Sequence, residues 1–256
     1  MLPIARFLYP LLLACLPVSL AAADDLAPPP DKGDFSAFIR SVNDKPYGYE
    51  IVDDPTGTAP AKRVERFEVR AGDCGVSKGW SDCARNRERS ELREGRPMSP
   101  AGSEAWYGWW FYLPETWPDV WPTKTVIGQF HQWRANVIWM FLNYRGGLWL
   151  DDMSGGGTSR RIPLIAAATL RGRWHRVEVH ARWARDKTGF LRVWIDGVKK
   201  ADLAGSTMTA DTVYFRYGVY RSFVSRYERA TGKTGVPTQW ALFAKVRKAK
   251  TREGLD

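Results

Sequence analysis

Short runs in which aromatic or β-branched residues alternate with polar ones recur along most of this chain, separated by turn residues. Such period-two runs predict β-strands, because successive side chains of a strand point to opposite faces of its sheet. With few helical stripes between them, they predict an all-β protein built as an antiparallel β-sandwich. The clearest runs are Val64 to Val69, Trp106 to Leu113, Thr125 to Trp133, Val137 to Tyr144, Trp174 to Trp183 and Phe190 to Ile195.

A hairpin turn is the clearest connection between these runs. Asp196-Gly197 directly follows the run that ends at Ile195, and Asp-Gly favours a two-residue hairpin turn. We therefore expect residues 172–197 to form consecutive antiparallel strands. Short helices near Phe35 to Val42 or Leu164 to Leu170 would not change the fold class.

The first 23 residues have the order of a secretory signal peptide, with Arg6, the apolar run Phe7 to Leu20 and then small residues. That run is too short and too interrupted by proline to span a bilayer. In an alternative interpretation, Cys15 is the lipid-modified residue of a lipoprotein, although the apolar stretch continues past it. The sequence thus predicts a secreted or periplasmic protein with a signal peptide in residues 1–23, a flexible leader in 24–34 and one domain in 35–256.

The charge of the chain predicts the class of its partner. Removing residues 1–23, which contain Arg6 and no acid, lowers the formal net charge from +10 to +9. Such an excess favours polyanions, and for an exported protein that means an acidic polysaccharide and not nucleic acid. The alternative is a basic surface without a specific partner. We expect a monomer with no membrane span.

Cys74 and Cys83 are the only cysteines outside the predicted signal peptide, and glycines flank them. In an oxidising compartment, such an isolated pair predicts a disulfide that closes a loop. A metal site would need further ligands nearby, and the three histidines are distant in sequence. We therefore predict no metal site. A structural Ca²⁺ is left open, since the sequence has no dense acidic loop for it.

Three polar stretches contain the candidate site residues, and the first is Arg89 to Glu94. On a strand, Arg89, Glu91 and Arg93 project from one face, whereas Leu92 points into the core. Two guanidiniums form an array of donors that suits sugar carboxylates, with Glu91 orienting the arginines. The alternative is an exposed ladder of salt bridges.

The second stretch is Val126 to Trp133. Its alternation places Gln129, His131 and Trp133 on one face, an amide, an imidazole and an indole in a row that can contact a sugar. The alternative for an isolated histidine is a structural role, which is what we expect for His175 and His180.

The third stretch is Val213 to Ser222, in which Tyr214, Arg216, Gly218 and Tyr220 share one strand face. A cation close to a phenol lowers the cost of forming the phenolate. Gly218 leaves room for a sugar ring to approach the backbone. The alternative is an amphipathic surface strand.

In this order, the three stretches resemble the motifs of the jelly-roll polysaccharide lyases, a group that includes alginate lyases, glucuronan lyase and heparin lyase I. The matching segments are Arg89-Ser90-Glu91-Leu92-Arg93, Gln129-Phe130-His131 and Tyr214-Phe215-Arg216-Tyr217-Gly218-Val219-Tyr220. The resemblance covers most of the chain from about residue 60 onward and implies a concanavalin A-like jelly roll. Two departures stand out: Arg216 replaces the usual Lys, and Arg221-Ser222 replaces an Asn-Gln that is frequent in alginate lyases, which puts alginate in doubt.

The resemblance implies β-elimination at a 4-linked uronate, with an unsaturated uronate end as product. It implies no cofactor, because β-elimination needs no redox partner. Gln129 with Arg89 or Arg93 would neutralise the sugar carboxylate, Tyr220 would protonate the departing O4, and His131 or Tyr220 would remove the C5 proton. The expected substrate-binding residues are Arg216, Tyr214, Glu91 and Trp133.

Two other functions are alternatives. A non-catalytic carbohydrate-binding protein would also be basic and rich in Trp, but binding alone needs no pair of proton-transfer groups. A glycoside hydrolase needs two free carboxylates at a set separation. The adjacent pair Asp151-Asp152 does not provide them, because its side chains point to opposite faces of a strand.

Overall fold

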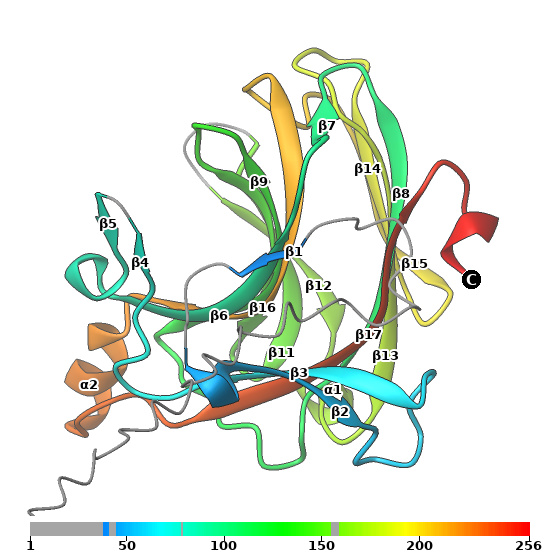
Figure 1. The fold of residues 1–256 in the computed structure, drawn as a ribbon. Coiled ribbons are helices and arrows are strands. Elements are labelled where there is room, and N and C mark those ends of the chain that lie inside the picture. The colour runs from blue at the N-terminus through cyan, green and yellow to red at the C-terminus, as the bar shows by residue number, and fades with distance from the viewer. Residues whose placement is uncertain (1–37, 41–44, 78, 155–158) are drawn as a thin grey trace, which may run out of the picture.

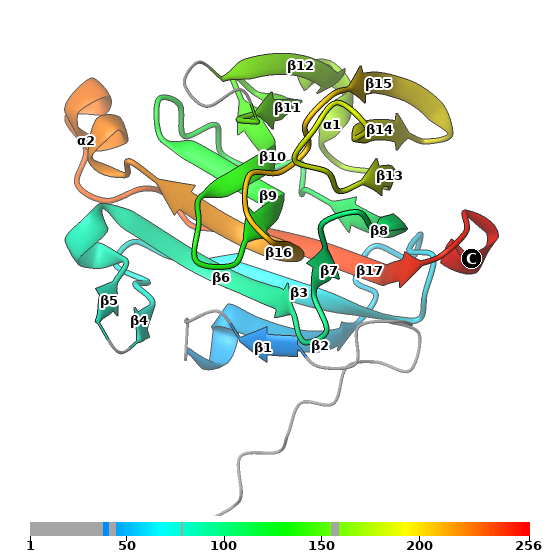
Figure 2. The ribbon, with the colours of Figure 1, turned by 90° about the horizontal axis from the view of Figure 1, so that it is seen from above.

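Two antiparallel sheets packed face to face make up this structure, a computed structural model that describes residues 38–40, 45–77, 79–154 and 159–256. Figures 1 and 2 show the two layers from the side and from above. The predicted signal peptide and leader lie outside the described residues. No helix in the described part of the chain is long and apolar enough to cross a membrane.

The eight-stranded sheet carries the three motif strands side by side. Its order is β1 (Phe38–Arg40), β6 (Arg87–Glu94), β16 (Thr212–Ser222), β9 (Lys124–Gln132), β10 (Val137–Tyr144), β11 (Gly147–Asp152) and β12 (Arg160–Ile165), and β7 (Ser99–Pro100) also pairs with β16. The motif strands β6, β16 and β9 are therefore direct neighbours, although they lie far apart in the sequence.

The seven-stranded sheet forms the other layer. Its order is β15 (Val198–Ala204), β14 (Phe190–Ile195), β13 (Trp174–Arg182), β8 (Glu104–Tyr112), β17 (Gln239–Ala249), β3 (Arg63–Val69) and β2 (Tyr49–Asp53). The remaining elements are short: η2 (Pro46–Gly48), β4 (Val76–Ser77), β5 (Trp80–Ser81), η3 (Cys83–Arg85), α1 (Ala167–Leu170), α2 (Ser225–Thr231) and η4 (Glu253–Leu255).

The core lies between the two sheets and is largely aromatic. Alternation along β8 turns Tyr107, Trp109 and Phe111 inward, where each is at most 1% exposed. The Trp109 ring lies 4.7 Å from that of Phe215 on β16 and 4.9 Å from that of Phe141 on β10. Burial of such large side chains is the main favourable term in folding, so the inward rows fix the face that each strand presents to solvent.

The structure confirms the antiparallel sandwich and the six predicted strands, which correspond to β3, β8, β9, β10, β13 and β14. Asp196 and Gly197 both have positive φ, 50° and 80°, as a hairpin turn of type I′ requires. Of the two segments considered for helices, Leu164 to Leu170 contains α1. The other is wrong in its described part, because Phe38–Arg40 pairs with β6 as a strand.

A β-bulge in β9 sets the direction of the second motif. Gly128 pairs with Phe141 and Val126 with Leu142, so Ile127 has no partner on β10. Val126 packs on the outer face beside Tyr220, Ile127 packs in the core, and Gln129 faces outward again. The extra residue therefore brings Gln129 and His131 onto the same outer face as Val126.

Candidate functional site

A cavity of about 620 Å³ opens on the outer face of the eight-stranded sheet, over β6, β16, β9 and β10. The β4–β5 hairpin rises beside this face (Figure 1). We call it the cationic cavity, and its lining consists of Trp80, Arg85, Arg87, Arg89, Lys124, Gln129, His131, Ala135, Asn136, Val137, Met140, Met153, Arg216, Tyr220, Ser222 and Phe223. The structure thus brings together residues from all three motifs.

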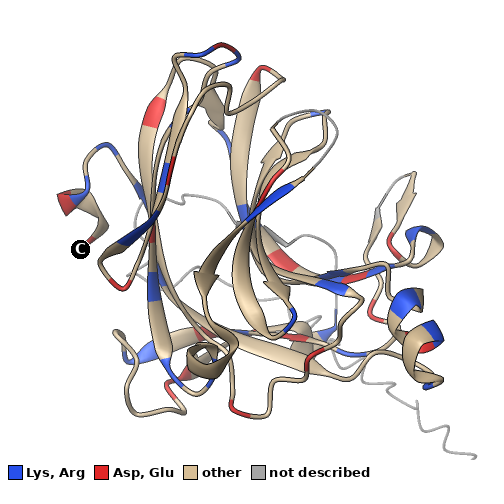
Figure 3. Ribbon diagram, turned by 180° about the vertical axis from the view of Figure 1, so that it is seen from behind, with Lys and Arg blue, Asp and Glu red and all other residues tan. Residues whose placement is uncertain are grey.

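The charge of the lining is of one sign. Five of its side chains are Lys or Arg and none is Asp or Glu. Basic residues also occur on strands of both sheets and on α2 (Figure 3), but in the cavity they converge on one enclosed space. A cleft lined by one sign of charge concentrates ligands of the opposite sign, so this cavity suits a polyanion.

Arg89 is held from behind by two buried carboxylates. Its Nε and Nη2 donate to Asp82 at 2.5 and 2.6 Å, and its Nη1 donates to Glu91 at 3.2 Å. Burial opposes the charge, but Glu91 and Asp82 outweigh it and raise the pKa of Arg89 above its ordinary value. The guanidinium is therefore a fixed positive charge at the wall of the cavity.

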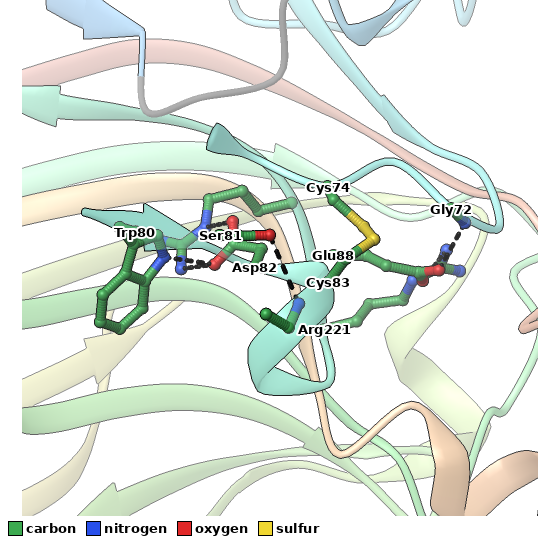
Figure 4. Close-up of a disulfide and its surroundings, with 10 residues drawn as sticks. Gly72, Cys74, Trp80, Ser81, Asp82, Cys83, Glu88 and Arg221 are labelled. Atoms are coloured by element: carbon green, nitrogen blue, oxygen red, sulfur yellow. Dashed lines mark hydrogen bonds and ion pairs between the residues drawn. A yellow bond between two sulfur atoms is a disulfide. The ribbon is translucent and has the colours of Figure 1, made fainter. Parts of the chain in front are cut away.

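Asp82 was not predicted from the sequence, and the disulfide explains its place. Cys74 and Cys83 are joined, which confirms the predicted bond, and Asp82 precedes Cys83 directly. Figure 4 shows the disulfide with Asp82 and Trp80 on one side and Gly72 on the other. Asp82 is fully buried and also accepts a hydrogen bond from Trp80 Nε1 at 2.9 Å. Its position beside a half-cystine was the only signal in the sequence.

Glu91 is the centre of the hydrogen-bond network under the cavity. Its carboxylate accepts bonds from Gln129 Nε2 at 2.6 Å and from Arg89, and it lies 3.7 Å from Arg216 Nη1. The expected arrangement of Arg89 and Arg93 around Glu91 is therefore wrong in one partner. Arg216 is the second arginine beside Glu91 instead of Arg93. It lies on β16, between β6 and β9, and its side chain reaches Glu91 on the neighbouring strand β6.

Arg93 lies outside the cavity lining. It pairs in register with Arg216, and its guanidinium carbon is 5.9 Å from the Tyr214 ring. Burial and the neighbouring Arg216 lower the pKa of Arg93. Because Arg89 lines the cavity and Arg93 does not, Arg89 is the one of these two arginines that faces the cavity.

His131 is half-buried and uncharged at neutral pH. Burial, and next the positive charge of Arg216, lower its pKa from 6.5 to about 4. Its Nδ1 lies 2.9 Å from the backbone oxygen of Gln132, and a carbonyl can only accept, so Nδ1 carries the proton. Nε2 therefore has a lone pair available, which makes His131 competent as a base.

Tyr220 lies on the same outer face and is 9% exposed. Burial raises the pKa of its phenol, while Arg89 and Arg87 work in the opposite direction. The Arg89 guanidinium carbon is 4.6 Å from the Tyr220 ring centre. The phenol is therefore protonated at neutral pH and can donate its proton.

Arg216, Tyr214 and Trp133 differ in their access to the cavity. Arg216 lines it, and its buried Nε has no hydrogen-bond partner among the described residues. Tyr214 is 4% exposed and packs against the His131 ring at 5.5 Å, so it supports His131 from outside the lining. Trp133 follows the end of β9, is 38% exposed and lies outside the lining, beside Arg96 at 5.5 Å.

Gly218 has a different role from the expected one. Its φ is +126°, and a Cβ there would overlap the Ser90 carbonyl oxygen and lie 2.8 Å from the Phe67 ring. The position requires glycine because of the backbone of the bulged β16 and its close contact with β6. Space for a sugar ring is not the reason.

Several cavity residues were missed in the sequence. Arg85 and Arg87 follow Cys83, and their guanidinium carbons lie 4.1 and 5.2 Å from the Trp80 ring centre. Lys124 begins β9 and pairs with Asp151 at 3.4 Å. Arg87 lies two positions before Arg89 on one strand and was open to inference. The position of Arg85 depends on the fold of the disulfide loop, and that of Lys124 on the pairing of β9 with its neighbours.

The two remaining histidines lie on the seven-stranded sheet, away from the cavity. His175 Nδ1 is 2.8 Å from Asp196, and His180 Nε2 is 2.7 Å from Glu104. Both therefore have structural partners, as expected. In the described part of the chain, no three His, Cys, Asp or Glu side chains lie together in a way that would hold a metal.

Comparisons with known proteins agree with this geometry. A family model described as polysaccharide lyase matches residues 31–245. None of the curated protein sequences matches the chain. Among solved structures, the chain is similar to an endo-β-1,4-glucuronan lyase from the fungus Trichoderma reesei, at 19% identity and a TM-score of 0.63 over 87% of this chain and 94% of that one.

Two alginate lyases are similar to a comparable degree. One is AlgAT5 of polysaccharide lyase family 7, at 13% identity and a TM-score of 0.60 over 86% of this chain and 97% of that one. The other comes from Corynebacterium sp., at 16% identity and a TM-score of 0.53 over 86% of this chain and 96% of that one. At these identities the likeness concerns the fold, and it confirms the jelly-roll sandwich.

Proposed function

Because the chain belongs to the polysaccharide lyase family, we propose that its cationic cavity binds an acidic polysaccharide and cleaves it at a 4-linked uronate by β-elimination. The observation that carries this proposal is a lining of five cations without a carboxylate, joined by a neutral imidazole and a protonated phenol. The structural likeness to a glucuronan lyase and to alginate lyases supports polyuronates as the substrate class.

The first step is neutralisation of the sugar carboxylate. The C5 hydrogen of a uronate is poorly acidic while the adjacent carboxylate keeps its full negative charge. Arg216 has unused hydrogen-bond donors, and Arg89 and Gln129 lie on the strands to either side of it. Glu91 holds all three in place, so these donors are oriented before the substrate arrives.

The second step moves two protons. His131 removes the C5 proton through Nε2, the electrons of that C–H bond form the C4=C5 double bond, and the C4–O4 bond breaks. Tyr220 then donates its phenolic proton to the departing O4. This assignment suits sugars in which the C5 hydrogen and O4 lie on opposite faces of the ring. Where they share a face, as in glucuronate, Tyr220 performs both transfers: it starts as the phenolate, removes the C5 proton and then gives that proton to the departing O4.

Of the residues that depart from the family pattern, Arg216, Arg221 and Ser222, only Arg221 is withdrawn from the cavity. Arg221 is fully buried and its Nη2 pairs with Glu88 at 2.5 Å, so it does not reach a substrate. Ser222 lines the cavity. The difference from the alginate lyase pattern therefore acts through Ser222 and through Arg216.

Glycoside hydrolysis has no support in this geometry. Hydrolases of this kind require a pair of carboxylates that face the sugar, and the lining of the cavity contains none. The Asp151 side chain is fully buried between Lys124 and Arg161.

We further propose that the protein is exported, as its first 23 residues predict. The Cys74–Cys83 disulfide supports this proposal, because such bonds persist in oxidising compartments.

The test is a panel of polymers that contains glucuronan, alginate, heparin, pectate and a neutral glucan. We expect ultraviolet absorbance from an unsaturated uronate product with at least one acidic polymer and none with the neutral glucan. Release of new reducing ends without this absorbance would indicate hydrolysis and contradict the proposal. The Tyr220→Phe variant serves as the inactive control.

A further inference from the structure

Two cross-strand rows continue from the cationic cavity across the outer face of the eight-stranded sheet. One consists of register partners on five adjacent strands, Arg89, Tyr220, Val126, Leu142 and Trp149. The other consists of Arg216, Gln129, Met140, Asp151 and Arg161. Such rows run perpendicular to the strands, so a polymer that leaves the cavity along them passes over Trp149 and Arg161.

The ends of the two rows form a cluster of rings and guanidiniums. Tyr144 is its centre: its ring lies 5.8 Å from that of Trp149 in an edge-to-face arrangement, and the Arg161 guanidinium carbon lies 4.5 Å above it. Trp121 packs edge-on against Tyr144 at 4.6 Å, and Arg145 lies 5.4 Å from the Tyr144 ring centre. We call Tyr144, Trp149 and Arg161, with Trp121 and Arg145 at the rim, the aromatic platform.

The platform is open to solvent and continuous with the cavity. Tyr144, Trp149 and Arg161 are half-buried, and Trp121 is 40% exposed. Tyr144 also packs against the small apolar cluster that contains Tyr220 and Val126. Gly147 leaves space for the Trp149 side chain, since a Cβ at this position would lie 3.3 Å from its indole nitrogen.

The charge of the platform is positive. Asp151 is fully buried, and its two carboxylate oxygens lie 3.4 Å from Lys124 of the cavity and 3.4 Å from Arg161 of the platform. One carboxylate thus faces two cations. Arg161 contacts Asp151 through its buried Nε, and neither the Nη groups of Arg161 nor Arg145 has an ion pair among the described residues. The guanidiniums therefore retain donors for an anion.

We propose that the aromatic platform is a further subsite, which binds a uronate residue of the same polysaccharide away from the bond that is cleaved. The Trp149 and Tyr144 rings contact the apolar face of the sugar, and Arg161 and Arg145 bind its carboxylate. Three strand spacings separate β16 from β11, about 14 Å, so only an oligomer longer than the residues at the cleaved bond reaches the platform. The inference rests on the proposed function.

The test compares chain lengths. Trp149→Ala, Arg161→Ala and Trp121→Ala are assayed on a cleaved polymer and on the shortest oligomer that the unaltered enzyme cleaves. We expect kcat/KM to fall about tenfold on the polymer, the size of one lost stacking or charged contact, and to be unchanged on the short oligomer. Trp194→Ala and Arg192→Ala, on the outer face of the seven-stranded sheet, are matched controls that should retain polymer activity.

Binding separates this inference from the proposed function. The affinity of uronate oligomers of increasing length is measured by calorimetry with Tyr220→Phe, alone and combined with Trp149→Ala or Trp121→Ala. We expect the gain in affinity with length to disappear in the combined variants. If it remains, or if short and long substrates lose activity equally, the platform is not a subsite. Absence of cleavage by the unaltered protein would contradict only the proposed function, because the binding comparison still stands.

Discussion

Arg89 and Arg216 lie on neighbouring strands, yet their guanidiniums are engaged to different degrees. All three nitrogens of Arg89 donate to buried carboxylates, whereas Arg216 has one contact at 3.7 Å and an unpartnered Nε. Fixed donors contribute most where charge develops, because they need no reorganisation during the reaction. Because Arg216 is less engaged, we infer that it binds the substrate carboxylate directly. Arg89 then acts mainly through the electrostatic field of its fixed positive charge.

Replacing the Tyr220 phenol tests the proton transfer directly. Tyr220→Phe removes one hydroxyl, so we expect turnover to fall by about a hundredfold to ten-thousandfold while substrate affinity is largely retained. Arg216→Ala should instead weaken binding as well, because its contact exists before the transition state. Initial rates and equilibrium binding on one substrate measure both effects. Full activity of Tyr220→Phe would show that β16 only binds the sugar.

The pH profile tests the role of His131. A base must be neutral, and the folded-state pKa of His131 is about 4 instead of 6.5, so kcat/KM should fall only as the pH drops through about 4. Tyr220 must be protonated to act as an acid, and burial raises its pKa, so the alkaline limb should lie above about 10. In His131→Ala the rate should be nearly abolished. A modest loss instead would mean that Tyr220 both removes and returns the proton.

At the scale of elements, the β4–β5 hairpin and η3 are tied to both faces of β6. On one face Arg89 binds Asp82. On the other face, Glu88 accepts a hydrogen bond from the Gly72 backbone N–H at 2.6 Å and forms an ion pair with Arg221. The disulfide closes this loop between the two attachment points. The loop therefore fixes the anion behind Arg89, and this gives it a role in the site as well as in stability.

Removing the disulfide should lower both the stability of the protein and its activity. Cys74→Ser with Cys83→Ser should lower the free energy of unfolding by about 2 to 3 kcal/mol, the loop-closure term for two cysteines nine positions apart. It should also reduce kcat/KM, because Asp82 loses its fixed position. Urea unfolding and rates at a temperature where both proteins are folded measure these effects.

Asp82→Asn provides the matched comparison, since it keeps the disulfide and the shape of the side chain. If the loop acts through Asp82, the activity losses of the two variants should not add when they are combined. Full addition of the losses would mean that the disulfide affects the site by another route. Two freely alkylated thiols in correctly exported protein would contradict the bond itself.

The sequence predicted the motif strands but not all of their contacts. Alternation placed Arg89, Gln129 and Tyr220 on outward faces, because apolar residues on the opposite faces, such as Leu92 and Phe130, had to be buried. It did not show that β16 lies between β6 and β9, so Glu91 was assigned to Arg93 instead of Arg216. Asp82 was not predicted, because its contact with Arg89 depends on the fold of an irregular loop. Such a loop has no periodic pattern in the sequence from which its fold could be inferred.

For the molecule as a whole, the net charge and the cavity predict a strong effect of salt. Apparent affinity for a polyuronate should fall as ionic strength rises, since exposed charges are screened beyond about 8 to 10 Å at moderate salt. Binding to acidic polymers and to a neutral glucan at two salt concentrations measures this. Equal preference for the neutral glucan would remove the electrostatic argument.

The perpendicular rows of the eight-stranded sheet also bear on how such an enzyme changes its range of substrates. Each strand that a bound chain crosses adds one increment of about 4.8 Å to the length that is recognised. With the aromatic platform as a subsite, the number of strands that a bound chain crosses from Tyr220 onward would set the length that is recognised. Loss of the platform residues on β10, β11 and β12 would then shorten that length and leave Tyr220 and His131 in place, so a chain of this kind could change the length it binds without altering the residues that cleave.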